Sequence, residues 1–528
     1  MTDQIYTVPR TLWLISREYA GIAEAGGVKN VACSLCEGLA AKGCAVTLLI
    51  PRYACSDFHA VTEYTPDCVA PQQVCVAEKE YTVSFDSGYC NGVKLVFVLH
   101  QIFADKTGVY TYTAEDERRD PRRKRGTGHA DALLMDVLFQ KAVLAYGTVC
   151  GLLPDVIHCQ DAATALIPVM ARNLAPFSDF FGRTRFAVTI HNAGPGYHHE
   201  FPSVAAAIEY TGLPEPLVSA AVNGAAVEPF LLAGAYAGLS TVSPWYADEL
   251  LNPANADTGG LSVLFSRRHF RIKGITNGID CGKYDPSDTA KSLLPFAFAP
   301  ARGELDGKYK NRKFFIETYA GKAAVSDAYP ALVRSGYLQN EKKGERPVYF
   351  CYHGRIVSQK GIDILILAAS SLLASRTDAR VVIVGQGEAL LENALGDLAV
   401  KYAGRCVYFC GYDRAVSRLA TAVSDFIVLP SKFEPCGLED FIGQLFGTVP
   451  VAHATGGLNK ISDGETGFLY TKNTPEQLLS VLTRLTALVK NEPSALYSLI
   501  ERGAVCVADR YAWEKVIERE YVPFYAGL

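Results

Sequence analysis

The stretch VYFCYHGRIVSQKG (residues 348–361) decides the fold. It begins with an apolar run rich in aromatic and β-branched residues, passes through a glycine-containing loop, and leads into the helical pattern of Ile362–Ala374. A strand without a polar face is buried on both sides, as in a parallel sheet covered by helices. The stretch therefore predicts the first β–α unit of a doubly wound α/β domain.

Apolar runs of the same kind recur on both sides of this stretch. The later ones are Val381–Val384, Cys406–Phe409, Phe426–Leu429 and Val449–His453, and the earlier ones are Thr11–Ser16, Cys44–Ile50, Val93–Leu99, Val156–His158, Phe186–Ile190 and Leu239–Val242. Between the two series, strand signals thin out from Pro244 to about Lys343. We therefore predict two Rossmann-like domains with doubly wound parallel sheets, residues 1–245 and 246–508, facing across a deep cleft, with the hinge near residue 244.

Length and charge limit the function classes. The chain has 528 residues, 49% of them hydrophobic, which is too long for a single hydrophobic core. Its net charge of -4 gives no general attraction to nucleic acid or to an anionic membrane. Residues 1–10 are mostly polar, and no uninterrupted apolar run reaches the ~18–20 residues of a membrane span. We therefore expect a cytoplasmic protein that has neither nucleic acid nor a membrane as its partner.

The cysteines predict core packing and no metal site. Most of the 15 cysteines lie in apolar segments, such as Cys44 beside Val46–Ile50. The one C-x-x-C pair, Cys33 and Cys36, lies in a helical pattern and lacks a second ligand pair at zinc-finger spacing.

One strongly basic run, RRDPRRKR, occupies residues 118–125. Its proline and dense like charge predict a mobile surface loop, and we assign it no catalytic role. An anionic partner or regulator is the alternative interpretation.

Three loops carry residues suited to binding a sugar nucleotide. Gly26 and Gly27 precede a helical pattern, where backbone N–H groups can meet a phosphate, although such a pair is often only a tight turn. Arg355 and Lys360 follow a strand and can converge on a diphosphate as it leaves. Glu434 follows another strand, in PSKFEPCGL (residues 430–438), and can accept hydrogen bonds from sugar hydroxyls.

Taken together, these motifs resemble the bacterial glycogen synthases and plant starch synthases along nearly the whole chain. The segments that match are HGRIVSQKG (353–361), EPCGL (434–438), TGGL (455–458), HCQD (158–161), TIHN (189–192), TVSP (241–244), ITNGID (275–280) and Gly411-Tyr412.

The resemblance implies a GT-B fold and a retaining transferase. The implied reaction moves glucose from ADP-glucose to the non-reducing 4-hydroxyl of an α-1,4-glucan such as glycogen, without a metal or cofactor. A C-terminal helix, about Ala512–Phe524 within a segment 509–528, would cross back to the first domain. ADP as opposed to UDP is implied by the resemblance alone.

The resemblance also implies the roles of individual residues. Arg355 and Lys360 would hold the diphosphate, Glu434 the glucose hydroxyls, His191 would lie by the glucose, and Asp161 would line the acceptor side. The implied donor-binding residues are Gly26, Gly27, Tyr412, Cys436, Gly437, Leu438, Thr455, Gly456 and Gly457. For three of these residues a structural role is the alternative: a core histidine for His191, a helix N-cap for Asp161, and packing for Tyr412.

The chain departs from the family pattern in two places. Glu24 stands where the family has a lysine, so a carboxylate would repel the diphosphate unless Glu24 turns away or Lys29 reaches it. The segment AGPGYHH (193–199) is longer than the family's version. The segment HCQDAA (158–163) lacks an aromatic residue and a histidine after the Asp. Both departures predict a different acceptor preference.

Other functions stay open at this point. They are a related GT-B transferase with another nucleotide or acceptor, a glucan-binding protein that has lost catalysis, and an NAD-dependent enzyme. The last lacks a G-x-G-x-x-G after the first strand. Within the transferase, front-face attack and a covalent intermediate on an enzyme carboxylate both remain possible routes.

Overall fold

A computed structural model describes residues 6–342 and 344–528 of the chain. The chain divides into two compact units. Unit 1 ends at Gly278 and takes up Trp513–Leu528, and unit 2 is Ile279–Ala512. The first five residues, on which the expectation about the N-terminus partly rests, lie outside the described residues.

Unit 1 is built on a nine-stranded sheet whose core is parallel. Its strands run in the order β11-β10-β7-β6-β1-β2-β5-β4-β3. Their bounds are β1 Thr11–Ile15, β2 Ala45–Pro51, β3 Thr62–Val76, β4 Lys79–Cys90, β5 Val93–Leu99, β6 Val156–Gln160, β7 Arg185–Ile190, β10 Gly238–Thr241 and β11 Ile272–Gly274. Leu12 of β1 pairs with Val46 on one side and with Val156 on the other. The predicted apolar runs of the first series correspond to the strands β1, β2, β5, β6, β7 and β10.

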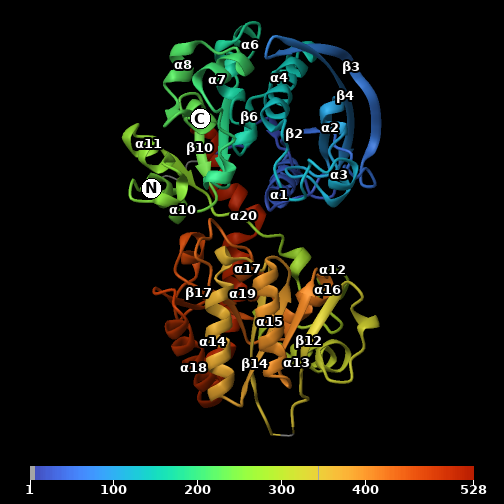
Figure 1. Ribbon diagram of the computed structural model, residues 1–528, viewed down its shortest axis with the longest axis vertical. Helices are drawn as coiled ribbons and strands as arrows, with labels where there is room; N and C mark the ends of the chain where they lie inside the picture. Colours follow the sequence, from blue (N-terminus) through green and yellow to red (C-terminus); the bar gives the residue numbers. More distant parts are fainter. Residues whose placement is uncertain (1–5, 343) are drawn as a thin grey trace. The chain divides into compact units, whose positions relative to one another are not determined.

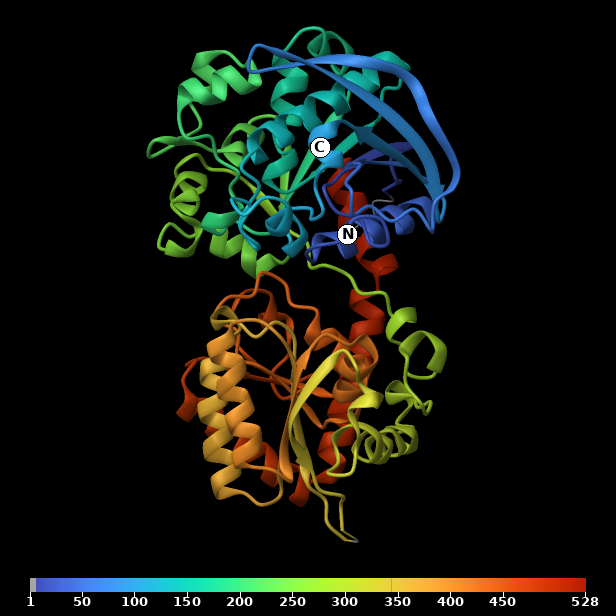
Figure 2. The same ribbon diagram turned by 45° about the vertical axis from the view of Figure 1, so that its right-hand side comes forward.

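The strands β3 and β4 form a long antiparallel ribbon at one edge of this sheet (Figures 1 and 2). Most side chains of β3 are exposed, and its pairing with β4 shifts register three times. The sequence analysis did not predict this ribbon, because β3 carries Pro66 and Pro71 and has no continuous apolar face.

Helices pack around the sheet of unit 1. They are α1 Val28–Ala41, α2 Gln101–Ala104, α3 Ala114–Arg119, α4 Ala132–Cys150, α5 Ile167–Asn173, α6 Phe177–Phe180, α7 Val204–Thr211, α8 Glu215–Ser219, α9 Pro229–Ala233, α10 Pro244–Leu251 and α11 Leu261–Arg267; a small hairpin joins β8 Val222–Asn223 and β9 Ala226–Val227. By length and composition alone α4 could span a membrane, but it is largely buried and packs against β3, so it serves as a core helix.

Unit 2 contains a seven-stranded sheet in the order β12-β15-β14-β13-β16-β17-β18. The bounds are β12 Leu332–Leu338, β13 Val348–His353, β14 Ala379–Gly385, β15 Arg405–Gly411, β16 Phe426–Leu429, β17 Val449–His453 and β18 Phe468–Tyr470. Only β12 is antiparallel to its neighbour. Phe350 at the sheet centre pairs with Val381 and Phe426, which confirms the predicted second doubly wound domain.

The α-helices of unit 2 include some that come before its first strand, and from β13 to β17 they alternate with strands, as a doubly wound sheet requires. They are α12 Thr289–Ser292, α13 Asp306–Phe315, α14 Ile362–Ser375, α15 Ala389–Lys401, α16 Arg414–Val423, α17 Glu439–Leu445, α18 Pro475–Asn491 and α19 Pro493–Tyr511.

The boundary between the units lies later than the predicted residue 245. Strand β11 pairs in parallel with β10 and so extends the first sheet through Gly274, which places the division between Gly278 and Ile279. With only three residues, β11 gives too short an apolar run to be recognised in the sequence. At the other end the division falls after Ala512, four residues later than the predicted 508.

The last helices of the chain are part of unit 1. They are α20 Trp513–Val516 and α21 Val522–Ala526, joined by a π-helical turn, Ile517–Tyr521. The Tyr525 hydroxyl lies 2.9 Å from Nδ1 of His158 in β6, and the Tyr525 carbonyl accepts a hydrogen bond from Arg185 in β7. Buried hydrogen bonds thus fix the C-terminus to the centre of the first sheet.

The basic run 118–125 starts in a helix and continues outside regular secondary structure. Its first two arginines end α3, which starts with a capping box at Thr113. Arg122 donates to the Asp120 carboxylate, and Lys124 pairs with Glu117 at 3.1 Å. Acidic neighbours therefore neutralise much of the run's charge.

Candidate active site

Both parallel sheets change the direction of their strand order at one point, where ligands of such folds bind. In unit 2 this switch point lies between β13 and β16, and in unit 1 between β1 and β6. In unit 2 the loops after β13, β16 and β17 are residues 354–361, 430–438 and 454–458, called here the switch-point loops. They contain every donor-binding residue predicted in unit 2 except Tyr412.

The first two switch-point loops are joined through their backbones. The Lys432 N–H donates to the Gln359 carbonyl at 2.9 Å. Gly361 has φ +68°, and a Cβ there would come within 1.9 Å of the Pro430 carbonyl oxygen. Only glycine permits this approach.

The third switch-point loop packs on the second in the same way. The Gly457 N–H donates to the Glu434 carbonyl at 2.8 Å, and a Cβ on Gly457 would lie 2.3 Å from the Cys436 carbonyl oxygen. Gly437 has φ +74°. The two sequence motifs EPCGL and TGGL are therefore one backbone unit, with Cys436 buried beneath it.

Lys360 and Glu434 meet at the centre of these loops. The Lys360 ammonium lies 2.5 Å from the Glu434 carboxylate, and both side chains are largely buried. The Ser431 hydroxyl donates to the same carboxylate oxygen at 3.0 Å. Burial lowers the pKa of Lys360, but the carboxylates of Glu434 and Glu439 outweigh it and raise that pKa. The structure thus brings together two residues that are 74 positions apart in the sequence.

Glu439, directly after EPCGL, is a residue that the sequence analysis missed. Its carboxylate accepts a hydrogen bond from the Leu438 N–H at 3.2 Å. Burial opposes its ionisation, but Lys360 and His353 lower the pKa of Glu439 to about 2. The only signal in the sequence was an acidic residue next to the motif.

Lys460, also missed, connects the second and third switch-point loops from below. Its side chain is buried, its ammonium lies 3.0 Å from the Asp440 carboxylate, and it donates to the carbonyls of Cys436 at 2.6 Å and Gly437 at 3.0 Å. A fully buried cation with these partners fixes the backbone that carries Glu434.

The remaining predicted residues of unit 2 differ in their exposure. The Arg355 side chain is exposed. Tyr412 is 66% exposed, which contradicts the alternative that it only packs. The Thr455 hydroxyl donates to the Lys432 carbonyl at 3.4 Å, Leu438 is half-buried, and Gly456 is buried at the start of a short 3-10 turn.

In unit 1, Asp161 and His191 follow neighbouring strands, β6 and β7. The Asp161 carboxylate accepts a hydrogen bond from the His191 N–H at 2.7 Å and makes no cap bond to the turn after it, so the N-cap alternative is wrong. Asp161 has φ +62°, a strained value for a non-glycine residue and one that is typical of functional sites. Burial raises the pKa of Asp161 to about 7.

The His191 ring is held by its neighbour in β6. Its Nε2 lies 2.8 Å from the Gln160 side-chain oxygen, and burial lowers the pKa of His191 to about 4. The imidazole is therefore neutral near pH 7. It is hydrogen-bonded, as the core alternative requires, but it is only half-buried and lies at the strand end beside Asp161.

In the Gly26–Gly27 loop, a side chain of the protein binds backbone N–H groups that were predicted to meet a phosphate. The buried Glu18 carboxylate accepts hydrogen bonds from the Gly26 N–H at 2.5 Å and the Ala25 N–H at 3.0 Å. Two N–H groups that could meet a phosphate are thus bound to a carboxylate in this conformation. Gly27 is exposed and immediately precedes α1.

Glu24, the residue at the family's lysine position, is paired. Its carboxylate lies 2.8 Å from the Lys29 ammonium and accepts a hydrogen bond from the Gly21 N–H at 2.8 Å. The Lys29 ammonium therefore neutralises the Glu24 carboxylate within unit 1.

Two histidines anchor the long segment after β7. His198 Nδ1 lies 3.0 Å from the buried Glu228 carboxylate, and His199 Nδ1 lies 2.6 Å from Asp136. Asp136 also receives a hydrogen bond from the buried Arg17 at 2.9 Å. The segment is therefore fixed to Asp136 in α4 and to Glu228, the residue directly before α9.

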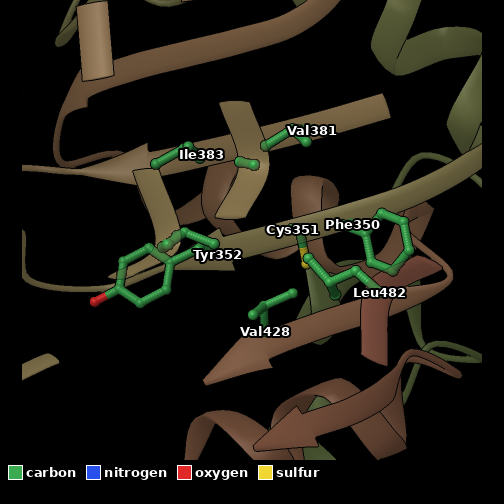
Figure 3. A pocket seen from close by; sticks show the side chains of 9 residues that line it. Phe350, Cys351, Tyr352, Val381, Ile383, Val428 and Leu482 are labelled. Carbon is green, nitrogen blue, oxygen red and sulfur yellow. The ribbon is translucent and has the colours of Figure 1, made fainter. Parts of the chain in front are cut away.

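The core of unit 2 also contains an apolar cavity of about 10 Å³ (Figure 3). It is lined by side chains of the central strands, including Phe350, Cys351 and Val428. It is too small for a sugar and has no polar lining group, so we assign it no role. Among the residues that the structure describes, no three His, Cys, Asp or Glu side chains gather as metal ligands would.

Segments of both units match families of known proteins. Residues 11–266 match the family described as the starch synthase catalytic domain, and residues 347–487 match glycosyl transferases group 1. A glycogen synthase of Anaeromyxobacter dehalogenans is 30% identical over 524 residues, covering 97% of this chain and 98% of that one. A glycogen synthase of Thermodesulfovibrio yellowstonii is 28% identical over 539 residues, covering 98% and 97%.

Among solved structures, the catalytic domain of starch synthase IV from Arabidopsis thaliana, bound to ADP and acarbose, has a TM-score of 0.78 to this chain. The two are 22% identical, and the match covers 99% of each chain. At that identity the match establishes the shared two-domain α/β fold.

Proposed function

The chain belongs to the glycogen and starch synthase family of glycosyltransferases, and from this premise we propose that it transfers glucose from ADP-glucose to the non-reducing 4-hydroxyl of an α-1,4-glucan. Full-length similarity to glycogen synthases supports the acceptor class. ADP as the nucleotide is supported by the resemblance and by the ADP bound in the starch synthase IV structure.

The observation that carries the proposal is the arrangement of Arg355, Lys360 and Glu434 at the switch point of unit 2. Two cations follow β13 and a carboxylate follows β16, on loops locked together by glycine contacts. Cations there can neutralise the charge that develops on a departing diphosphate. A carboxylate beside them can accept hydrogen bonds from glucose hydroxyls.

In the proposed step, the bond between glucose C1 and the phosphate oxygen breaks and a bond from C1 to the acceptor 4-oxygen forms. The proton of the acceptor hydroxyl passes to the departing phosphate, and the anomeric configuration is retained. Lys360 and Arg355 stabilise the charge on the leaving diphosphate. The proposal assigns no metal and no cofactor to this step.

Unit 1 would provide the groups for the acceptor and for the transferred sugar. We assign Asp161 to the acceptor side because its side chain is fixed by the His191 N–H and its strained backbone is typical of a functional position. His191 is neutral and can exchange hydrogen bonds with the glucose without carrying charge. The anchored segment 193–199 is our candidate for a difference in acceptor preference.

Radiolabelled glucose transfer tests the proposal directly. Purified protein is incubated with glycogen and either ADP-glucose or UDP-glucose, and the labelled product is digested with an enzyme that cleaves α-1,4 links. We expect incorporation from ADP-glucose and release of all label by digestion. Incorporation from UDP-glucose alone would replace the donor and keep the reaction. Folded protein that incorporates label from neither donor would contradict the proposal.

A further inference from the structure

Lys360 pairs with the Glu434 carboxylate, and a second carboxylate, that of Glu439 at the end of the same loop, has no role in the proposed reaction. Glu434 is within 2.5 Å of its ammonium, and the charge of Glu439 also acts on it. Arg355 adds one more positive charge to this group of side chains. Two positive and two negative charges leave the proposed diphosphate site with no net charge.

Glu439 is fixed in place and stays charged. Its carboxylate accepts a hydrogen bond from the Leu438 N–H at 3.2 Å, at the end of the EPCGL motif. Its charge also acts on His353 and Tyr352, which end β13 just before the loop that carries Lys360. With a pKa lowered to about 2 by Lys360 and His353 against the effect of burial, it is ionised at every pH at which the enzyme would be assayed.

An anionic ligand at Lys360 is therefore opposed by the charge of the Glu439 carboxylate. The Leu438 N–H, a donor that could reach a phosphate oxygen, is bound to the same carboxylate. A second negative charge beside a diphosphate costs free energy that an uncharged group of the same shape would not.

Building on the proposed function, we propose that Glu439 determines donor affinity by opposing the diphosphate at Lys360. The Glu439 carboxylate lowers the affinity of the site for ligands that carry negative charge. Removing the charge of Glu439, with its shape kept, makes nucleotide diphosphates bind more tightly. This direction is unusual, since most substitutions in a binding site weaken binding.

The test measures the binding of ADP, inorganic pyrophosphate and adenosine by calorimetry. Glu439→Gln keeps an oxygen to accept from the Leu438 N–H and removes only the charge. We expect Kd for ADP and for pyrophosphate to fall by about tenfold at low salt, and by less as salt screens the site. Adenosine, which has no phosphate, should bind the variant and the parent equally.

Three further proteins make the result interpretable. Glu439→Thr introduces a smaller uncharged side chain and should also tighten ADP binding. Agreement between the two variants would show that loss of the charge, and not a contact of the glutamine amide, is the cause. Glu476→Gln removes one negative charge from an exposed position at the start of α18 and should leave Kd for ADP unchanged. Lys360→Ala should lose most ADP binding, as the proposed function requires.

The outcomes separate the two proposals. Unchanged or weaker ADP binding by both Glu439 variants, with the Lys360→Ala loss present, would overturn the inference and leave the proposed function standing. A gain for adenosine equal to that for ADP would also overturn it, because charge would not be the cause. Absence of ADP and pyrophosphate binding in every protein would overturn the proposed function and this inference together.

Discussion

Replacing Lys460 by methionine tests whether the switch-point loops depend on a buried cation. The Lys460 and Asp440 side chains are 1% and 0% exposed, with 3.0 Å between ammonium and carboxylate. The substitution leaves a buried carboxylate unpaired and also removes the donor from the Cys436 and Gly437 carbonyls. Breaking a buried pair in this way costs about 3–5 kcal/mol.

That cost predicts a large shift in the unfolding of unit 2. For a domain of this size about 1 kcal/mol lowers the midpoint by about 2–4 °C, so Lys460→Met should lower the unit 2 transition by about 6–20 °C. Differential scanning calorimetry measures it, with the two units treated as separate transitions. Turnover should fall as well, because Glu434 lies on the loop that loses its support.

The matched control is the double variant Asp440→Asn with Lys460→Met. It removes both charges, so no unpaired ion stays buried, and it should recover most of the lost stability. It should not recover full turnover, since the two carbonyls still lack their donor. A shift of less than about 2 °C for Lys460→Met, or further loss in the double variant, would refute this reasoning.

Three other predictions follow from single side chains. Lys29→Ala leaves the Glu24 carboxylate without its 2.8 Å partner and should raise KM for the donor by about threefold to tenfold, while Lys29→Ala with Glu24→Ala should restore it; equal KM in all three proteins would contradict the pairing. Tyr412→Ala should weaken ADP binding by about tenfold and leave Tm unchanged, because a ring 66% exposed can stack on a base without packing in the core; Tyr412→Phe should behave as the parent, and a Tm loss of several degrees would refute this. Since burial raises the pKa of Asp161 from 3.8 to about 7, kcat/KM for the glucan should rise with pH through about 7 as the acceptor-side carboxylate ionises, and Asp161→Asn should not show this rise. The same shift predicts that the free energy of unfolding contributed by this carboxyl falls as pH rises from about 4 to about 7, because the folded state binds the proton more tightly than the unfolded chain.

The sequence predicted the parts of the fold that are buried on both faces. The central strands β1 and β13 are continuous apolar runs, and the helices after them have clear periodicity. Strand β3 is mostly exposed and interrupted by prolines, so no local pattern distinguished it from a loop. For the same reason the predicted domain boundary was too early in the chain, because β11 is identified only by its pairing with β10.

The sequence predicted those residues of the site that stand in motifs at strand ends, and it missed those that depend on how the loops pack. Arg355, Lys360 and Glu434 stand in motifs whose loops all emerge at the switch point, so their neighbourhood follows from topology. Lys460 and Glu439 act through contacts that depend on how two loops pack, which no local pattern records. The capture of the Gly26 N–H by Glu18 likewise required the folded backbone.

The central claim is that the switch-point loops of unit 2 carry glucosyl transfer, and the turnover of Lys360→Ala tests it most directly. Its control is Lys432→Ala, an exposed lysine on the second of these loops that pairs with Asp363 at 2.9 Å. With ADP-glucose and glycogen, we predict that Lys360→Ala loses at least about a hundredfold in kcat/KM while Lys432→Ala stays within about threefold of the parent. Equal activity of the folded Lys360→Ala protein and its parent would contradict the account.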